Sequence, residues 1–496
     1  MHCKIILSLI IAFFGVTSLH AQSFEDFKRA QFKSYSKYKE ERDQAFKNYL
    51  TKEWKAYQLS QGKKLYEKPK PKTIPKTIPT EHAPVGPKVT IKIPKLPVAP
   101  KPVVEIKPEV PAKPVEKQFP EPKKPIQAEK KAVSEPDRMD FYFFGTKVSL
   151  IVPASMRHAK LSSYDQRGIA GFFDQLATNE YEKVLSSFEK QHEQLQLNDW
   201  GGYLLLKAVS EKLYNKPAEA TLFSWFILNK QGYAVKVGLS GSEPVLLLHS
   251  KKVIYSTPNY SFGKEKYYAI EYYGKKGTGR LKTYPEKYQN ADKPFNMSLQ
   301  TMPDLHPYQK SKVLIFRYRG AEHTINVSYN KNLIDFMETY PQADYATYFN
   351  APLSSENRIL LLKQLKPMLD GKQASRAINF LLFFVQHAFE YQVDDQQFGR
   401  EKVMFADETL YYNASDCEDR AVLFAYLVKE LFNVDVIGVK YKDHMATAIA
   451  VPMKGETIKF GQSRYVIADP TYINASVGQS MPKYRNITPD SFIRVE

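Results

Sequence analysis

The sequence predicts an α+β protein with two lobes behind a long N-terminal arm. Segments with helical periodicity and segments with strand alternation follow one another over the last 360 or so residues, from 138 to 496. A chain of that length exceeds one ordinary hydrophobic core, so we expect two lobes. Before residue 138 the composition changes to charged and aromatic residues and then to proline, which predicts an arm without a core of its own.

The first residues have the pattern of a secretory signal peptide, residues 1–21. A basic start is followed by an apolar run over residues 5–16 and by a small residue, Ala21, after which we expect cleavage. The run is too short to span a bilayer, and no later stretch approaches about 20 apolar residues. We therefore predict an exported protein without a transmembrane segment, located in the periplasm or cell envelope or secreted.

The arm that follows has two parts. Residues 22–66 contain no proline, and aromatic side chains recur there mostly at spacings of three to five, which is typical of one face of a charged amphipathic helix. Such a stripe needs a partner, and we expect the protein's own C-terminal domain rather than a second copy or another surface. Residues 67–137 hold 17 of the chain's 32 prolines, interspersed with lysine, which predicts a disordered, extended linker.

The basic charge of the chain is concentrated in this arm. Residues 22–137 contain 26 Lys or Arg and 15 Asp or Glu, so they contribute +11 of the formal net charge of +18. Lysine at this density keeps the arm solvated, and it allows weak association with anionic cell-envelope polymers. Nucleic acid is not an expected partner, because the chain is exported and carries no nucleic-acid-binding motif.

Beyond the arm we expect a mixed α/β lobe over 138–262, a strand-rich segment over 263–345 and a further domain over 346–496. The segment Ala-Val-Leu-Phe-Ala-Tyr at 421–426 aligns with Ala-Thr-Leu-Phe-Ser-Trp at 220–225, and each precedes a valine-rich strand. The first lobe is therefore either a degenerate copy of the last domain or similar to it by chance. In this register Lys216 stands opposite Cys417 and Glu243 opposite His444, so the earlier copy would be catalytically dead.

Cysteine usage singles out one residue. The chain has two cysteines, and Cys3 lies in the predicted signal peptide, so the exported protein would keep only Cys417 and form no internal disulfide. Ser415 and Glu418 have the spacing of a capping box, which predicts a helix that begins at Ser415 with Cys417 in its first turn. The helix dipole lowers the pKa of a thiol at that position. The alternative is a small structural cysteine.

Two further side chains are expected at the ends of strands. His444 begins a predicted strand and shares one face with small residues, by the period of two. Asp469 ends the next strand directly before a proline, which favours extended geometry. A histidine can take the proton of a thiol, and an acid can orient that histidine. Cys417, His444 and Asp469 are therefore the candidate catalytic residues.

These motifs together resemble the transglutaminase-like superfamily, which has a papain-like core. Asp-Cys-Glu-Asp at 416–419 is most similar to the bacterial transglutaminase-like cysteine peptidases, and Tyr-Val-Ile-Ala-Asp-Pro-Thr at 465–471 is similar to the superfamily's acid-bearing strand. The resemblance covers roughly 354–496. It implies attack of the Cys417 thiolate on an amide carbonyl, giving a thioester that water or an amine resolves. Ser415 in place of the usual glycine, and an extra loop at 453–462, leave the substrate class open.

The oxyanion donors and a metal are less clearly marked. We expect the Cys417 backbone N–H to donate to an oxyanion, with Gln386 and Tyr391 as candidate side-chain donors, although Gln386 can equally be a solvated helix residue. Some of the peptidases that the chain resembles bind calcium through acids beside the nucleophile, and Asp416 and Glu418 match that placement. Calcium takes six or more oxygens and the sequence offers two, whose place at a helix start explains them without a metal. No cofactor is therefore expected.

The leading hypothesis is an exported, thiol-dependent acyl-transfer enzyme, a cysteine protease or amidase that acts on a peptide or protein substrate. One alternative is a catalytically silent binding or scaffold protein of the cell envelope with the same core. The other is an amine-transferring transglutaminase. The complete triad favours an enzyme, whereas the choice between hydrolysis and amine transfer depends on water exclusion, which residue patterns do not reveal.

Overall fold

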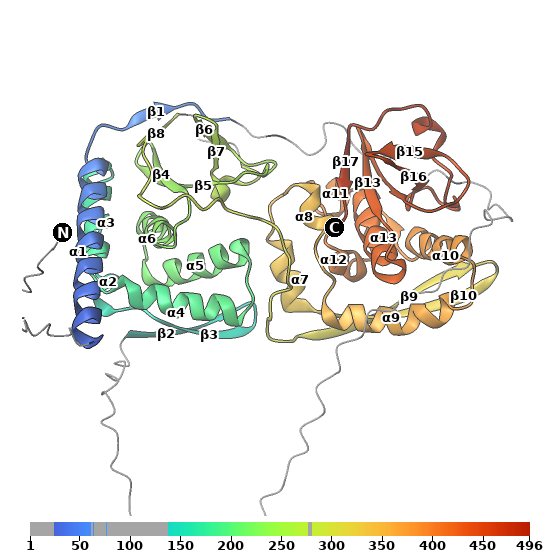
Figure 1. Cartoon of the computed structure of the whole chain (residues 1–496), viewed down its shortest axis with the longest axis horizontal. Helices are drawn as coiled ribbons and strands as arrows, with labels where there is room; N and C mark the ends of the chain where they lie inside the picture. The colour runs from blue at the N-terminus through green and yellow to red at the C-terminus, as the bar shows by residue number, and fades with distance from the viewer. Residues whose placement is uncertain (1–23, 61–62, 64–75, 77–136, 276–279) are drawn as a thin grey trace, which may run out of the picture.

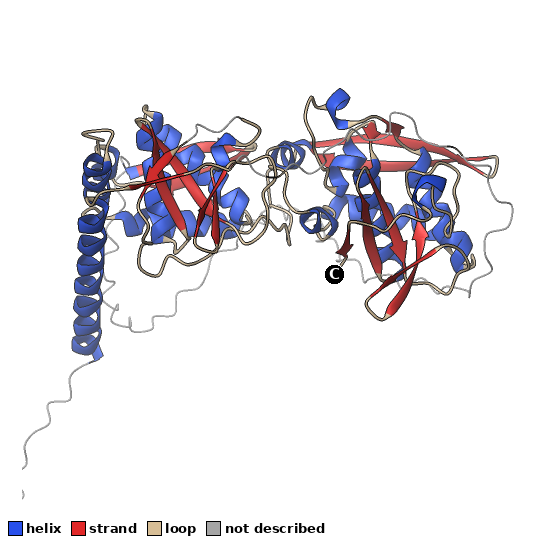
Figure 2. Cartoon of the chain, turned by 90° about the horizontal axis from the view of Figure 1, so that it is seen from above, coloured by secondary structure: helices blue, strands red, loops and turns tan. Residues whose placement is uncertain are grey.

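The computed structural model describes residues 24–60, 63, 76, 137–275 and 280–496 (Figure 1). The predicted signal peptide and nearly all of the predicted linker therefore lie outside the described residues. Within them the protein mixes helices with mainly antiparallel sheets, which confirms the α+β class. Among the helices that the structure describes, none combines the length and the apolar character needed to cross a membrane. Figures 1 and 2 both place two lobes side by side, with the N-terminal helix on the outer side of the first.

The N-terminal helix α1 (Phe24–Leu50) packs on the first lobe through its second half. Phe46 is buried and meets the edge of Phe173, with the ring centroids 5.2 Å apart. The buried carboxylate of Asp43 accepts a hydrogen bond from Lys230 Nζ at 2.5 Å. The second half of the predicted aromatic stripe thus packs on the first lobe rather than on the C-terminal domain, and Phe32 and Tyr35 in its first half are exposed. The helix ends at Leu50, short of the expected end of the helical segment at residue 66.

The first lobe combines a hairpin, a group of helices and a sheet in the order β1-β8-β4-β5-β7-β6, in which all neighbouring strands are antiparallel. Its elements are β1 (Lys55–Tyr57), β2 (Arg138–Phe143), β3 (Thr146–Ile151), α2 (Ala154–Arg157), α3 (Gln166–Ala177), α4 (Tyr181–Gln194), α5 (Asp199–Leu213), α6 (Pro217–Lys230), β4 (Val235–Ser240), β5 (Glu243–His249), β6 (Asn259–Phe262), β7 (Glu265–Tyr268), η2 (Ile270–Tyr272) and β8 (Leu281–Thr283). Helix α6 packs on β4 and β5, so its apolar residues and the sheet form one core.

The second lobe also combines a hairpin, helices and an antiparallel sheet, here in the order β15-β16-β14-β13-β17. Its elements are β9 (Gln309–Tyr318), β10 (Ala321–Asn330), α7 (Lys331–Glu338), α8 (Tyr345–Phe349), α9 (Ser355–Leu369), α10 (Ala374–His387), β11 (Glu390–Tyr391), α11 (Asp394–Gln397), α12 (Ala406–Tyr411), β12 (Ala414–Ser415), α13 (Cys417–Phe432), β13 (Val436–Tyr441), β14 (His444–Ile449), β15 (Thr457–Phe460), β16 (Ser463–Ala468), η3 (Pro482–Tyr484) and β17 (Ser491–Arg494). Helix α13 packs against both β13 and β14.

The strand-rich segment expected over 263–345 does not form a unit of its own among the described residues. Strands β7 and β8 complete the sheet of the first lobe, whereas β9 and β10 form a hairpin that packs against α9 and α10 of the second lobe. Alternation along a segment marks a strand but does not specify which edge it pairs with. The change from one lobe to the other therefore falls between β8 and β9.

Candidate active site

Cys417 is the first residue of α13 and is fully buried. The N-cap is Asp416, whose backbone N–H donates to Asp419 Oδ2 at 3.1 Å as part of a capping box. The predicted capping box of Ser415 and Glu418 is therefore one residue out of register. The reason is tertiary, because Ser415 lies in β12, which pairs with β11.

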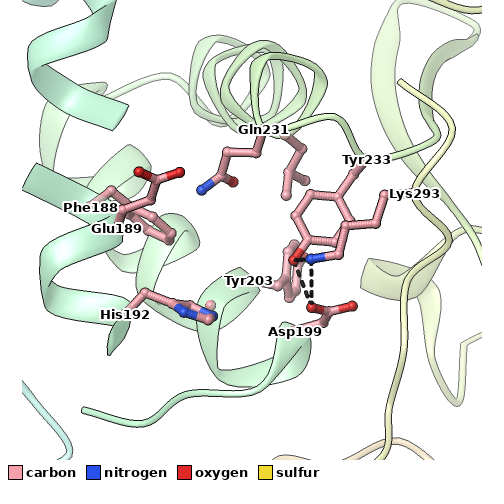
Figure 3. Close-up of a pocket in the computed structure, with 10 residues that line it drawn as sticks. Phe188, Glu189, His192, Asp199, Tyr203, Gln231, Tyr233 and Lys293 are labelled. Atoms are coloured by element: carbon pink, nitrogen blue, oxygen red, sulfur yellow. Dashed lines mark hydrogen bonds and ion pairs between the residues drawn. The ribbon is translucent and has the colours of Figure 1, made fainter. Parts of the chain in front are cut away.

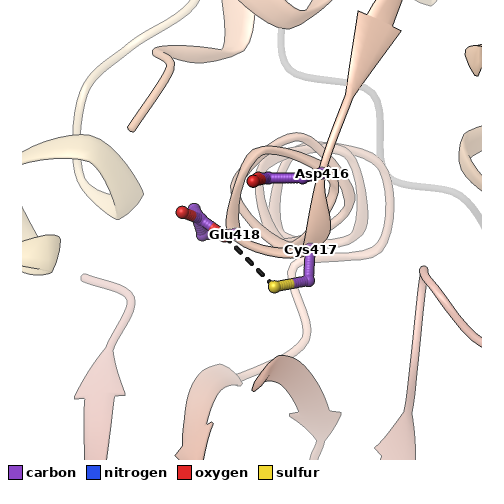
Figure 4. A group of neighbouring side chains, drawn as sticks. All are labelled: Asp416, Cys417 and Glu418. Atoms are coloured by element: carbon purple, nitrogen blue, oxygen red, sulfur yellow. Dashed lines mark hydrogen bonds between the residues drawn. The ribbon is translucent and has the colours of Figure 1, made fainter. Parts of the chain in front are cut away.

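The thiol of Cys417 contacts the carboxylate of the next residue. Its Sγ donates a hydrogen bond to Glu418 Oε2 at 3.1 Å, and Figure 4 shows Sγ directed toward that carboxylate. The side chain of Asp416 lies close by, since the ligand atoms of Asp416, Cys417 and Glu418 all lie within 4.8 Å of one another. The thiol is thus directed at one carboxylate and lies beside a second.

His444 and Asp469 form the hydrogen bond that the sequence predicts. His444 is the first residue of β14, Asp469 directly follows β16, and the two strands are neighbours in the sheet. His444 Nε2 lies 2.9 Å from Asp469 Oδ2, and both side chains are buried. The other oxygen, Oδ1, accepts the backbone N–H groups of Thr471 and Tyr472 at 2.9 and 3.2 Å. The carboxylate is therefore fixed through both of its oxygens.

The bond to Asp469 determines the tautomer of His444. A carboxylate accepts, so Nε2 carries the proton and Nδ1 is the basic nitrogen, an assignment that follows from the hydrogen-bond network. His444 Nδ1 is buried and has no hydrogen-bond partner among the described residues. The ring can therefore receive a proton at Nδ1 while Asp469 stabilises the resulting charge.

Tyr484 packs on His444, and the charges of the other two predicted residues act on it. Its ring stacks on that of His444, with centroids 4.9 Å apart and planes 15° from parallel. Burial is the main cause that raises the pKa of Tyr484, and the negative charges of Asp443, Cys417 and Asp469 raise it further. Such charge effects require proximity. The packing of α13 on β14 supports the same arrangement.

The segment that carries Tyr484 also covers the site. Tyr484 Oη donates to Asp443 Oδ1 at 3.0 Å, and Lys483 forms an ion pair with the same carboxylate. Burial alone would raise the pKa of Asp443, but these two partners outweigh it and hold that pKa below its usual value. Cys417 and His444 are both 0 % exposed, so a substrate reaches the thiol only after some covering segment moves.

Weakening the contact at Asp443 is expected to open the site. In Asp443→Asn we expect iodoacetamide to label Cys417 of the folded protein several-fold to about tenfold faster, because a partly exposed ion pair and one charged hydrogen bond together contribute about 1–2 kcal/mol. Asp490→Asn is the matched control, since Asp490 pairs with Lys440 at the protein surface. Equal labelling rates in the two variants would show that this segment is not the cover. Because the pKa of Asp443 is depressed, the contact is present above the usual carboxyl pKa and is lost as the pH falls through the depressed value.

The prediction that Gln386 donates a hydrogen bond to an oxyanion is wrong. It is buried, and its Nε2 donates to the backbone carbonyls of Asp469, Tyr472 and Ala475 at 3.0, 2.9 and 3.1 Å. Its Oε1 accepts the backbone N–H of Asn474 at 3.1 Å. An amide has two N–H bonds, so these acceptors already use its donor capacity. Gln386 is a positioning residue for the loop that follows Asp469, and it is not a solvated helix residue either.

Tyr391, the other oxyanion candidate, lies in β11. It is in register with Ser415 of the parallel strand β12, two residues before Cys417. Its ring lies under the guanidinium of Arg420, 5.6 Å from centroid to Cζ. The structure therefore places Tyr391 beside the start of α13, and its role as a donor stays a prediction.

Arg420 is a functional-site residue that sequence reasoning missed. It is 0 % exposed. Its Nε donates to Ser415 Oγ at 3.1 Å, and its two terminal nitrogens donate to the carbonyls of Gln386, Phe389 and Glu390 at 2.9–3.1 Å. Burial lowers the pKa of Arg420 to about 10, so it stays charged at neutral pH. It ties the first turn of α13 to the end of α10, and only the apolar pattern around it hinted at its burial.

An acidic cluster lies beside the thiol and is larger than the sequence suggested. Three overlapping groups of side chains bring ligand atoms within 4.8 Å of one another. Their members are the predicted calcium candidates Asp416 and Glu418, with Cys417 and Asp419 of α13, Asp394 at the start of α11 and Glu401 from the loop after α11. Carboxylate oxygens are the ligands that Ca²⁺ prefers, so this donor set fits a hard divalent cation.

A small polar cavity of about 150 Å³ lies apart from these residues, in the first lobe (Figure 3). Asp199 Oδ1 accepts hydrogen bonds from Tyr233 Oη at 2.6 Å and from Lys293 Nζ at 3.2 Å. Its Oδ2 accepts the backbone N–H of Asn296 at 2.8 Å. These charged groups pair with one another and connect α5 to the loop that carries Lys293, which accounts for them as structural groups.

Comparison with known proteins found no relative of this chain. No model of a known protein family matches the chain, and no curated protein and no solved structure matches it.

Proposed function

We propose that the protein is a thiol-dependent acyl-transfer enzyme, a cysteine protease or amidase that acts on peptides or proteins. The observation that carries this proposal is the bond between His444 Nε2 and Asp469, which leaves a basic Nδ1 beside a helix that begins with Cys417. A histidine in that tautomer is the base that a thiol nucleophile requires. We further propose that the second lobe is a transglutaminase-like domain with a papain-like core, in which one helix carries the nucleophile and two neighbouring strands carry the base and the acid.

The chemistry follows from these positions. His444 Nδ1 takes the proton of Cys417 Sγ, and the thiolate attacks the amide carbonyl carbon, so that its oxygen becomes an oxyanion. The N–H groups of the first turn of α13 have no intrahelical acceptor, and that of Cys417 is the proposed oxyanion donor. His444 then returns the proton to the leaving amine as the C–N bond breaks. Water or a second amine, deprotonated by His444, resolves the thioester and restores the thiol.

The complete burial of Cys417 and His444 also bears on the alternatives. A site that never opens would suit the catalytically silent scaffold of the cell envelope. A site that opens only to its substrate would exclude water, which favours amine transfer over hydrolysis. Export to the periplasm, the envelope or the medium, and contacts of the basic arm with anionic envelope polymers, remain proposals based on the N-terminal sequence.

An assay that follows both products tests the proposed function. Fluorogenic peptides, or an envelope protein fraction, are incubated with the protein with and without a primary amine. Free acid as the product supports a hydrolase, and an amine-labelled product supports a transglutaminase. Binding of the peptides without consumption of any of them, in either condition, would contradict the enzyme and favour the scaffold.

Calcium is bound by some of the peptidases that the chain resembles, and the acidic cluster, which is larger than the sequence suggested, fits that ion. Asp394, Asp416 and Glu418 would hold the ion, and it would supply a positive charge that neutralises buried carboxylates next to the first turn of α13. The bond from the thiol to Glu418 belongs to the same cluster, so an ion there would also change the surroundings of Cys417. None of the proton transfers above passes through the ion.

Calcium is therefore expected to stabilise the second lobe. Millimolar CaCl₂ should raise the Tm by several degrees and a chelator should reverse the shift, because a ligand at 100 times its Kd contributes about 2.7 kcal/mol. In Asp394→Asn, which keeps the size of the side chain, the shift should largely disappear. Asp435→Asn is the control, because Asp435 lies at the surface, where it forms an ion pair with Lys429. An equal shift in both variants, or no shift in the wild type, would rule out this site.

A further inference from the structure

We propose that the first lobe is a degenerate copy of the second and that it keeps, where the candidate active site would lie, a pocket that binds a short peptide through the peptide's positively charged group. The pocket is distinct from the catalytic residues and belongs to a lobe without a thiol among its described residues. The choice of a peptide as ligand rests on the proposed function, whereas the pocket itself does not.

The two sheets have the same connectivity. Read from the opposite edge and without β1, the order in the first lobe is β6-β7-β5-β4-β8, and it matches β15-β16-β14-β13-β17 strand for strand. In both lobes a helix, α6 or α13, precedes the first of these strands in the chain and packs on the sheet. In both, a short 3₁₀ helix lies between the fourth and the fifth strand in chain order. The hairpin before the helices, β2-β3 or β9-β10, is also repeated.

The strand register identifies the positions that correspond to the catalytic residues. Ser240 pairs with Glu243 across a two-residue turn, as Tyr441 pairs with His444, so Glu243 takes the place of the histidine. This agrees with the ungapped alignment of the two sequences. The first residue of α6 is Pro217, where α13 begins with Cys417.

The position of Asp469 corresponds to Glu271. Leu248 pairs with Tyr268, and the equivalent residue Ile449 pairs with Val466. Three residues beyond these partners stand Glu271 in the first lobe and Asp469 in the second. The first lobe has therefore lost the nucleophile and the base but keeps an acid at the end of the equivalent strand.

A cavity of about 490 Å³ lies at this position. It is lined by the start of α6, by the second half of α5 and by Glu271 in η2. One wall is α6, which corresponds to the helix that begins with Cys417, and another is Glu271, which corresponds to Asp469. The cavity therefore occupies the place that the closed site occupies in the second lobe. Its volume lies in the range of pockets that bind small ligands, about 300–1,000 Å³.

The charges of the lining suit a ligand that carries both signs. Lys207 lies 3.7 Å from Glu211 and 4.0 Å from Glu271, and Lys275 adds a second positive charge at the wall. Two acids and two lysines balance, so a polycation or a polyanion would meet repulsion, whereas a zwitterion such as a short peptide would not.

Glu271 is the group that would hold the ammonium of the peptide. It is only partly exposed, and Tyr203 Oη donates to it at a long 3.4 Å. Burial raises the pKa of Glu271, and Lys207 offsets this only in part, so a second cation close to this carboxylate would be stabilising. A peptide α-amino group, or a lysine or arginine side chain, supplies that cation.

Calorimetric titration of the full chain with trialanine tests the pocket. The titration uses Cys417→Ala, so that no peptide is consumed. We expect saturable binding of trialanine. When Glu271→Gln is added to Cys417→Ala, binding should be at least tenfold weaker. N-acetylated trialanine should show a similar loss of affinity. Glu189→Gln, at a different cavity of the first lobe, is the matched control and should bind normally. Thr221→Trp fills the cavity from α6 and should also abolish binding, with an unchanged circular dichroism spectrum.

Two results would overturn the proposal. One is that trialanine binds with equal affinity to the protein with Glu271→Gln and to the protein without it, which would place the peptide at the Cys417 site or elsewhere. The other is the absence of saturable binding in a folded protein. Turnover by the wild type is a separate readout. If the protein consumes peptides but does not bind them in this pocket, this inference fails and the proposed function stands. If it binds them here but consumes none, the proposed function fails and the pocket stands.

Discussion

Cys417→Ala is expected to lower the turnover of peptide substrates by about 10,000-fold or more, because the members of a catalytic triad act as a unit and little catalysis survives loss of the nucleophile. The measurement is kcat/KM with a fluorogenic peptide on purified wild type and variant. The free energy of unfolding should change by only about 1 kcal/mol, since the substitution removes a single buried sulfur.

Two further variants make this result specific. His444→Gln should lose nearly as much activity, because it removes the basic Nδ1. Ser415→Ala, two residues from Cys417, should retain most of the activity, since it removes only one of the hydrogen bonds that Arg420 makes. Activity retained in Cys417→Ala would assign the reaction to another residue.

Arg420→Met is expected to destabilise the second lobe by about 3–5 kcal/mol, the usual result of removing one partner from a buried charged network. The substitution leaves the carbonyls of Gln386, Phe389 and Glu390 without their donor. It also removes a positive charge that interacts with Asp416 and Asp419 at the start of α13. Denaturant unfolding followed by circular dichroism measures the loss, with the transitions of the two lobes analysed separately because a chain of two lobes need not unfold in one step.

Arg358→Met is the matched control for that experiment. Arg358 pairs with Glu430, and both side chains remain about one-fifth exposed, so the loss should be about 1 kcal/mol. Arg420→Lys should fall between the two variants, because lysine keeps the charge but cannot reproduce the fork of donors. Equal losses in Arg420→Met and Arg358→Met would show that the buried network is not what holds the first turn of α13.

The features that the sequence predicts well are those that local patterns encode. The helix of Cys417, the strand that begins at His444 and the acid before Pro470 each follow from periodicity or from a neighbour's geometry, and the structure has all three. The bond between His444 and Asp469 follows from their places at the ends of adjacent strands. The α+β class follows from the same local patterns.

Other features depend on contacts between distant segments. The capping residue of the helix shifted by one residue, from Ser415 to Asp416, because β12 pairs with β11, a contact that no spacing reveals. Gln386 was considered as an oxyanion donor because helical periodicity shows nothing of the loop after Asp469 that its amide binds. The acidic cluster appeared as two residues because Asp394, at the start of α11, and Glu401, in the loop after it, are brought to Asp416 only by the fold. For the same reason, the sheet partners of β7 and β8 were not predicted.

Trapping of an acyl-enzyme tests the central claim most directly. The protein is mixed at pH 7 with the p-nitrophenyl ester of a blocked amino acid, and the intact mass and the peptide that contains Cys417 are measured over time. We predict one acyl group per chain, on Cys417, formed much faster than on a model thiol, absent in Cys417→Ala and strongly slowed in His444→Ala. Acylation of Cys417 at the same rate in His444→Ala as in the wild type, or no acylation of the folded protein, would contradict the account.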